Sequence, residues 1–351
     1  MKRLISTQAL EKILIIRLSS IGDILLTTPV IRLLKQEYPK SKVDFVIKKE
    51  FVELLKYHPN ISQLYIFDKA KKSETLKNIK QKIKKENYDL IIDLHKNMRS
   101  YYLTIGSRAK QIIRYKKGVI RRFFLVKLKL NFYRNIIPIY FRYLHCLAPY
   151  QIFYDNQGLE IFFNKEIKQK VFQKYSRFLA GHRSLTIGIA PGARHATKRW
   201  TVEGFSTVIN YLIDEKQSKV IIMGGPADRD VSQSLNMQNN QSVLETTGRS
   251  TILETAVLIN CCDLLITNDS GLMHLASALK KKVVAIFGST TEELGFFPYP
   301  TEHIVVENSS LKCRPCSHIG RKRCPEGHFK CMKEITPKQV ISAVEELLIS
   351  A

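Results

Sequence analysis

Apolar residues along the first 95 positions follow two spacings in turn, one of strands and one of helices. The aliphatic run at residues 12–18 is typical of a buried parallel strand, which is apolar on both faces. After this run, Leu26, Val30, Leu33 and Leu34 share one face of a helix. Further runs predict strands at residues 42–47, 63–67 and 89–94.

The second half of the chain repeats this alternation. Its aliphatic runs predict strands at residues 186–190, 219–223, 263–267, 282–287 and 303–306. Capping boxes at 251–254 and 336–339 predict the starts of two helices, the second with Pro337 at its first helical position. Because 351 residues exceed the length at which one core keeps growing, the two series predict two parallel-sheet α/β domains. We expect these domains to face each other across a cleft, with their boundary at 165–183.

Charge changes this picture more than overall composition does. The net charge is +25, and residues 94–154 contain neither Asp nor Glu while basic and aromatic side chains alternate there. Such a segment favours an anionic partner: a nucleic acid, an acidic membrane face or a phosphorylated substrate. The alternative is a solvated surface of a lysine-rich protein. No apolar run approaches the roughly 20 residues of a membrane helix, and residues 1–8 lack the core of a signal peptide, so a cytoplasmic location is expected.

Candidate chemistry begins directly after the first predicted strand. Ser20, Gly22 and Asp23 lie at its carboxyl end, where open α/β sheets bind ligands. A lone carboxylate beside a glycine is a candidate general base. The alternative is that Asp23 only caps the following helix.

Three loops of the second half also follow predicted strands. Residues 191–200 carry three cations together with Thr197, and Lys198 is suited to be a point charge on a diphosphate. Gly224 and Gly225 form a turn that admits a nucleobase or ribose. The 269–271 loop opens a helix whose free N–H groups hold an anion, and the Asp269 carboxylate can accept hydrogen bonds from sugar hydroxyls. Together the loops suit displacement of a diphosphate from a sugar, although each taken singly is equally an ordinary turn.

Four of the seven cysteines gather near the C-terminus. Their spacing can hold a structural zinc ion but lacks a second tight pair, so we expect no metal or other cofactor. These residues are Cys313, Cys316, Cys324 and Cys331.

Three motifs, in order, resemble those of the bacterial lipopolysaccharide heptosyltransferases, glycosyltransferase family 9. They are residues 17–29, 191–200 and 267–274, and residues 93–100 have the same character. The resemblance extends over residues 12–350. It implies the GT-B fold, an α/β architecture of two Rossmann-like, doubly wound parallel-sheet domains. The implied parts are an acceptor-binding domain at 1–175, a nucleotide-sugar-binding domain at 180–335, and a C-terminal helix at 336–351 that packs back on the first domain.

The resemblance also implies an inverting, metal-independent transfer of heptose from ADP-heptose to the lipopolysaccharide inner core. The acceptor would be Kdo-lipid A or its heptosylated form, at the cytoplasmic face of the inner membrane, with no nucleic-acid partner. Asp23 would be the catalytic base and Lys198 the donor-phosphate lysine. The remaining donor contacts would be Thr197, Gly224, Gly225, Asp269, Ser270, Gly271 and His274. The acceptor contacts would be Ser20, Gly22, Lys96, Arg99, Arg121 and Arg122.

One departure and three alternatives remain. Pro226-Ala227-Asp228 stands where some members of the family carry a glutamate for the ribose, which leaves the nucleotide contacts open. The alternatives are a related GT-B enzyme with another nucleotide-sugar donor, a sugar-nucleotide epimerase of similar architecture, and a basic nucleic-acid-binding protein. No nucleic-acid module is recognisable, and an epimerase does not require a long basic segment.

Overall fold

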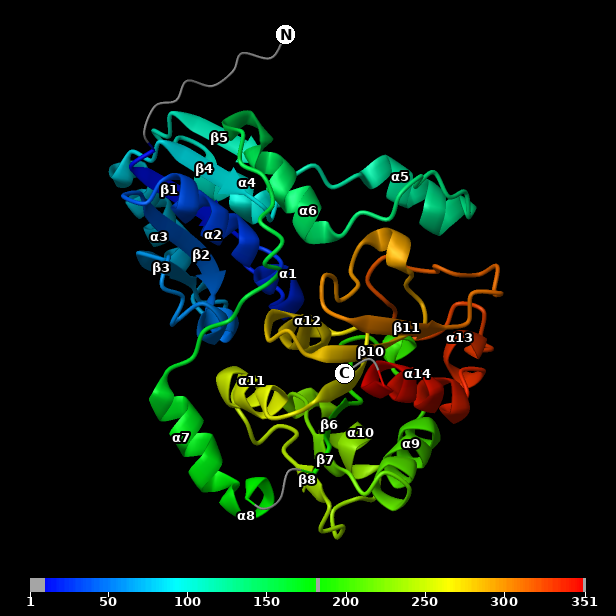
Figure 1. Cartoon of the computed structure of the whole chain (residues 1–351). Coiled ribbons are helices and arrows are strands. Elements are labelled where there is room, and N and C mark those ends of the chain that lie inside the picture. The colour runs from blue at the N-terminus through cyan, green and yellow to red at the C-terminus, as the bar shows by residue number, and fades with distance from the viewer. Residues whose placement is uncertain (1–9, 181–183, 350–351) are drawn as a thin grey trace. The chain divides into compact units, whose positions relative to one another are not determined.

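The computed structural model describes residues 10–180 and 184–349, so the expectation for residues 1–8 lies outside the described part. Those residues form two compact units, each built on one parallel sheet (Figure 1). The first unit contains the described residues up to Lys117 together with Ile139–Phe162. The second contains Gly118–Pro138 and the described residues from Phe163 onward.

The sheet of the first unit has the strand order β3-β2-β1-β4-β5, with every pairing parallel. Its strands are β1 (Lys12–Ile16), β2 (Lys42–Lys48), β3 (Gln63–Phe67), β4 (Leu90–Asp93) and β5 (Gln111–Arg114). Its helices are α1 (Ile21–Leu25), α2 (Thr28–Glu37), η1 (Lys49–Leu54), α3 (Lys72–Glu86), α4 (Met98–Thr104), α6 (Ile139–Leu144) and η3 (His145–Tyr150). Alternate residues of β1 lie on opposite faces, and Leu14 and Ile16 pack with the buried side chains of α3.

The strand order of this sheet reverses between β1 and β4, because β2 and β3 lie on one side of β1 and β4 lies on the other. Ligands of open α/β sheets bind at the carboxyl ends of the two strands that flank such a reversal. The segments that follow β1 and β4 therefore share the position expected for a site.

The sheet of the second unit has the order β11-β10-β9-β6-β7-β8, again with every pairing parallel, and reverses between β6 and β9. Its strands are β6 (Thr186–Ala190), β7 (Lys219–Ile222), β8 (Val243–Glu245), β9 (Leu264–Asn268), β10 (Lys282–Phe287) and β11 (His303–Glu307). Its longer helices are α7 (Lys165–Lys174), α9 (Val202–Asp214), α11 (Ile252–Asn260), α12 (Gly271–Ala278) and α14 (Pro337–Ile349). Its shorter ones are α5 (Val119–Phe123), η2 (Phe124–Leu128), α8 (Ser176–Leu179), η4 (Ala196–Lys198), η5 (Pro226–Asp228), α10 (Arg229–Gln233), η6 (Glu292–Leu294) and α13 (Lys330–Lys333).

One part of the chain groups differently from the expected domains. Gly118–Pro138 groups with the second unit, within the range expected to belong wholly to the first domain. The C-terminal helix α14 packs on α9, β10 and β11 of its own unit. Its apolar face joins the core formed by β6, β7, β9 and β10, and the packing on the first domain that the resemblance implied stays a prediction.

The predicted strands agree closely with those observed, and both capping boxes are present. Thr251 and Glu254 exchange hydrogen bonds at the start of α11, and Thr336 and Gln339 do so at the start of α14. Strands β5 and β8 were not anticipated, because β5 lies in the basic segment and β8 has only three residues. Among the described residues, no helix combines the length and apolar character needed to cross a bilayer.

Candidate active site

The loop after β1 holds the Asp23 carboxylate in place from several directions. Asp23 is the third residue of α1, and Ser20 is the N-cap, so the interpretation of Asp23 as the cap itself is wrong. The Ser20 backbone N–H and hydroxyl both donate to Asp23 Oδ2, at 3.1 and 2.9 Å. Arg17 Nη2 lies 2.5 Å from Asp23 Oδ1, and the Tyr143 hydroxyl lies 3.5 Å from the same oxygen. The side chain remains 19% exposed, which leaves it accessible to a substrate.

These contacts decide the protonation state of Asp23. Burial by itself raises the pKa of the Asp23 carboxyl, but the positive charge of Arg17 and the Ser20 hydrogen bonds outweigh it. The resulting pKa is below the usual value, so Asp23 is ionised throughout the neutral range. Arg17 is itself anchored, since it donates to the backbone oxygens of Ser19 and Leu94 at 2.9 and 2.6 Å.

His95 is a site residue that the sequence analysis did not single out. It follows β4, on the other side of the strand reversal from Asp23. Burial, together with the positive charges of Arg17 and Lys117, lowers the pKa of His95 to about 3, so the imidazole is neutral. Within the described residues, its buried Nδ1 atom has no hydrogen-bond partner. A neutral imidazole with an unused ring nitrogen is suited to hydrogen-bond a hydroxyl. The signal in the sequence was its position two residues after a strand end.

The residues expected to contact the acceptor lie in different parts of the structure, and only some of them are near Asp23. Gly22 is buried in α1, and Ser20 positions Asp23, as described above. The Lys96 backbone N–H donates to Asp93, which orders the loop after β4. Arg99 lies over the ring of Phe67, 5.8 Å from its centroid. Arg121 and Arg122 lie in α5, within the segment that groups with the second unit, so contacts within the first unit do not bring them to Asp23.

In the second unit, the loops after β6 and β9 meet at an ion pair. Lys198 Nζ lies 2.5 Å from Asp269 Oδ2, and the side chains are only 14% and 6% exposed. The Thr290 hydroxyl donates to the same carboxylate oxygen at 2.6 Å. The Lys198 cation and the Asp269 hydrogen-bond acceptor therefore lie together at the strand reversal. On ligand binding, each can turn to a different group of the ligand.

Buried Asn268, at the end of β9, connects these two loops. Its Oδ1 accepts from the Trp200 backbone N–H at 3.0 Å, and its Nδ2 donates to the Pro191 oxygen at 2.8 Å. The Trp200 indole donates to the Ile335 oxygen and packs on Gly204, where a Cβ atom would lie 2.4 Å from the ring. Asn268 is a positioning residue that no spacing in the sequence revealed.

The cysteine-bearing segment covers the Lys198 loop. The buried Thr197 hydroxyl lies 3.0 Å from Ser289 Oγ, and the Arg321 backbone N–H donates to it at 2.7 Å. At Gly320, whose φ of +98° favours glycine, a Cβ atom would lie 2.9 Å from Lys198 Cδ. Thr197 therefore holds this loop in place, and its expected contact with the donor stays a prediction.

The segment that carries the four clustered cysteines also carries His318 and His328. Within the described ranges, no three Cys, His, Asp or Glu side chains are placed to hold a metal ion. Cys313 Sγ lies 3.9 Å from His328 Nε2. Burial raises the pKa of the Cys331 thiol to about 11, so this side chain is protonated at neutral pH.

The turn after β7 is built around Asp228. The Gly225 backbone N–H donates to Asp228 Oδ2 at 3.0 Å, and Arg199 Nη2 lies 3.5 Å from Oδ1. A Cβ atom at Gly192 would lie 2.1 Å from Asp228 Cγ, so only glycine fits there. Asp228, which stands where a glutamate was expected from the resemblance, therefore lies where the loops after β6 and β7 approach each other.

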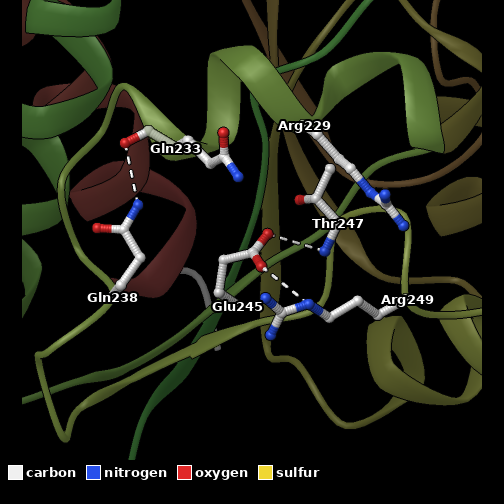
Figure 2. Close-up of a pocket in the computed structure, with 6 residues that line it drawn as sticks. All are labelled: Arg229, Gln233, Gln238, Glu245, Thr247 and Arg249. Atoms are coloured by element: carbon white, nitrogen blue, oxygen red, sulfur yellow. Dashed lines mark hydrogen bonds and ion pairs between the residues drawn. The ribbon is translucent and has the colours of Figure 1, made fainter.

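A cavity of about 380 Å³ lies at the carboxyl ends of β7 and β8 (Figure 2). Its size is within the range of small-molecule sites. Glu245 accepts from the Thr247 backbone N–H at 2.9 Å, and Figure 2 shows Arg249 turned toward the Glu245 carboxylate. Arg229 packs against Gly248, beside the Gly224 turn. The lining residues are Arg229, Gln233, Gln238, Glu245, Thr247 and Arg249.

Helix α12 begins at the strand reversal of the second unit. Ser270 is its N-cap, and the Ser270 hydroxyl lies 3.2 Å from Thr267 Oγ1 instead of capping the helix. The first turn, from Gly271, therefore presents backbone donors. His274, expected to contact the donor, is buried within α12 and packs edge-on to Phe296.

Comparison with known proteins identifies the family of this chain. The sequence pattern of glycosyltransferase family 9 (heptosyltransferase) matches residues 76–328. Lipooligosaccharide heptosyltransferase 2 of Campylobacter jejuni is 27% identical over 338 residues, which cover 93% of this chain and 95% of that protein. The crystal structure of a family 9 glycosyltransferase from Veillonella parvula has a TM-score of 0.80 at 27% identity, covering 97% and 98% of the two chains.

A more distant structure shares the fold. The heptosyltransferase WaaC of Escherichia coli, solved with ADP-2-deoxy-2-fluoro heptose, has a TM-score of 0.67 at 18% identity and covers 96% of this chain and 99% of its own. Two parallel-sheet α/β units and a family pattern spanning more than half of the sequence lead to one conclusion. This chain is a glycosyltransferase that belongs to family 9, the heptosyltransferases.

Proposed function

We propose that this protein transfers heptose from ADP-L-glycero-D-manno-heptose to the inner core of lipopolysaccharide, with inversion at the anomeric carbon. The observation that carries the proposal is the ionised, partly exposed Asp23 carboxylate at the strand reversal of the first unit. The curated relatives are named lipooligosaccharide and lipopolysaccharide heptosyltransferases, which supports the acceptor class. The bound ADP-sugar analogue of WaaC supports the donor class.

Asp23 takes the proton of the acceptor hydroxyl as its oxygen attacks the anomeric carbon. Its lowered pKa keeps it in the basic form at neutral pH, although it also makes Asp23 a weak base. The hydroxyl becomes acidic only as the new C–O bond forms, so the proton moves late. His95, neutral at this pH, accepts or donates a hydrogen bond that orients the acceptor.

Lys198 and the first turn of α12 stabilise the negative charge that grows on the leaving diphosphate. The Lys198–Asp269 pair separates as the donor binds, so that Lys198 contacts the diphosphate and Asp269 accepts from sugar hydroxyls. The nucleoside occupies the cavity beside the Gly224 turn, where Asp228 or Glu245 accepts from the ribose. These groups provide the positive charge locally, and we propose that no metal is needed. A chelator should therefore leave the rate unchanged, and elemental analysis of the purified protein should find no stoichiometric zinc.

The acceptor is amphipathic and anionic, which supports a peripheral position on the cytoplasmic face of the inner membrane. The excess of basic residues between 94 and 154 is consistent with phosphorylated, acidic core sugars as the acceptor. Lys96, Arg99, Arg121 and Arg122 are the proposed cationic contacts.

The decisive test is incubation with ADP-heptose and a panel of truncated lipopolysaccharide cores, followed by mass spectrometry. We expect one added heptose on one truncated core and no product with UDP- or GDP-sugars. Transfer from another nucleotide sugar alone would replace the proposed donor. Salt-dependent binding to random oligonucleotides, without binding of any ADP-sugar, would favour the nucleic-acid alternative.

A further inference from the structure

The segment Gly118–Pro138, called here the basic arm, concentrates exposed apolar side chains: it carries eight of the 18 exposed large apolar residues of the described part of the chain. Its exposed large apolar side chains are Val119, Ile120, Phe123, Leu128, Leu130, Phe132, Ile136 and Ile137, each 46–74% exposed. Folded proteins rarely gather so many exposed apolar residues in one short segment unless the segment meets a partner or a membrane.

Basic residues are interleaved with these apolar ones. Arg121, Lys127 and Arg134 are exposed, and the arm contains no acidic residue. Lysine and arginine attract anionic headgroups, while leucine, isoleucine and phenylalanine enter the boundary between headgroups and acyl chains. Both requirements of an interfacial membrane contact are therefore present within 21 residues.

The middle of the arm is hydrogen-bonded to the rest of the second unit. Lys129 Nζ donates to the backbone oxygens of Cys313 and Pro315, at 2.9 and 2.7 Å. Asn131 Nδ2 donates to Glu293 at 3.2 Å. Within the arm, the rings of Phe124 and Phe132 pack edge to face with centroids 5.2 Å apart. These contacts attach the arm, which carries α5 (Figure 1), to the rest of its unit.

The chemistry of the arm favours a bilayer over the other occupants. Proteins that bind single-stranded nucleic acid use aromatic rings on which bases stack, whereas five of the eight exposed apolar residues here are isoleucine or leucine and one more is valine. A second copy of this chain, with net charge +25, would oppose the arm electrostatically.

We propose that the basic arm is the membrane anchor of this protein and inserts its exposed apolar side chains into the headgroup region of an anionic phospholipid bilayer. The inference rests on the proposed function only for which membrane is bound, the cytoplasmic face of the inner membrane. Vesicle binding without any sugar donor therefore tests the anchor, while transfer to a water-soluble truncated core tests the reaction.

A tryptophan reporter gives the first measurement. The chain has one tryptophan, Trp200, which is 3% exposed and so contributes a constant background. In Phe132→Trp, addition of phosphatidylglycerol vesicles should shift the emission to shorter wavelength, and lipids brominated on their acyl chains should quench it. The matched control is Phe153→Trp, at a residue outside the arm that is 78% exposed, which should do neither. Equal behaviour of the two reporters would overturn the proposal.

Removal of the arm's side chains gives the second measurement. Phe123→Ser/Phe132→Ser should weaken partitioning onto phosphatidylglycerol vesicles at least about tenfold, whereas Phe153→Ser should leave it unchanged. Lys127→Gln/Arg134→Gln should weaken it roughly 10- to 30-fold. Binding to phosphatidylcholine vesicles should be weak for the wild type and unchanged in this variant. The serine variant should keep the wild-type rate on a soluble core.

Three results contradict the anchor. The first is unchanged vesicle binding of the serine variant. The second is a blue shift of Phe132→Trp that grows with protein concentration in the absence of lipid, which indicates an interface between copies. The third is tighter binding to a random oligonucleotide than to anionic vesicles.

Discussion

Replacement of Asp23 by asparagine tests the central residue of the proposed reaction with little change in shape. The amide oxygen can still accept from the Ser20 N–H and hydroxyl, so the start of α1 is retained. What is lost is the negative charge opposite Arg17 and the capacity to take a proton.

The expected magnitudes follow from these contacts. Loss of a general base lowers the rate about 10²–10⁴-fold, which corresponds to roughly 3–5 kcal/mol of activation free energy. Arg17 still donates to Ser19 and Leu94, so the fold loses one charge-assisted hydrogen bond, worth about 1.5–3 kcal/mol. ADP binding should change little, because the proposed donor residues belong to the second unit.

The stability difference between the wild type and the Asn variant should also depend on pH. The folded pKa of Asp23 lies below its ordinary 3.8. Its contribution to stability is therefore complete above about pH 4 and is lost as the pH falls through the lower folded value. Urea unfolding at neutral pH and near pH 3 should show the difference narrowing.

The assay is single-turnover transfer from ADP-heptose, with ADP affinity measured by calorimetry. Asp44→Asn is the matched control, because Asp44 is a buried carboxylate of the neighbouring strand that accepts from the Tyr88 hydroxyl at 2.6 Å. It should keep its turnover. If Asp23→Asn retains more than about a tenth of the wild-type rate, the base assignment is wrong, since even a weak general base contributes about a hundredfold.

Three further predictions concern other parts of the molecule. Lys198→Ala should weaken ADP-heptose binding and slow transfer together, and an unchanged affinity and rate in calorimetry and single-turnover assays would remove Lys198 from the site. Wild-type stability should fall by about 2 kcal/mol between pH 6.5 and 5, because His95 takes up a proton in this range in the unfolded chain but not in the folded one, where its pKa is about 3. His95→Gln should abolish this loss. Equal urea-unfolding pH profiles would contradict it. Arg32→Met should cost about 3–5 kcal/mol in urea unfolding, because the 7% exposed guanidinium holds Asp155 and Glu160, each at 2.7 Å, and an unchanged midpoint would show that these carboxylates find other partners.

Local patterns were sufficient for the layers of the fold. The aliphatic runs of β1, β9 and β10 are mostly apolar on both faces, and such strands can be stable only between two layers of helices. The capping boxes of α11 and α14 marked helix starts correctly because they involve residues only three positions apart. Strand β5 was not predicted from the sequence, because its four residues lie within the basic segment.

The candidate site was less accessible from the sequence. Asp23 and Lys198 follow strand ends, so their positions could be inferred from the parallel-sheet pattern. The protonation and pairing of these side chains could not be inferred in this way. Arg17 reduces the basicity of Asp23, and Asp269 forms an ion pair with Lys198 in the absence of a donor. The engagement of Thr197 with Arg321 joins residues 124 positions apart, which no local spacing encodes.

The order of apolar and polar residues by itself determined that this protein has two parallel-sheet series, and that reactive side chains follow the strands. The reason is that strand and helix periodicity, caps and strand ends are properties of neighbouring residues. Only the tertiary structure decided that His95 shares the strand reversal with Asp23, that α14 closes the core of its own unit, and that Lys129 secures the basic arm to the second unit. Those relations depend on contacts between distant segments, whose energies arise only once the sheets are assembled.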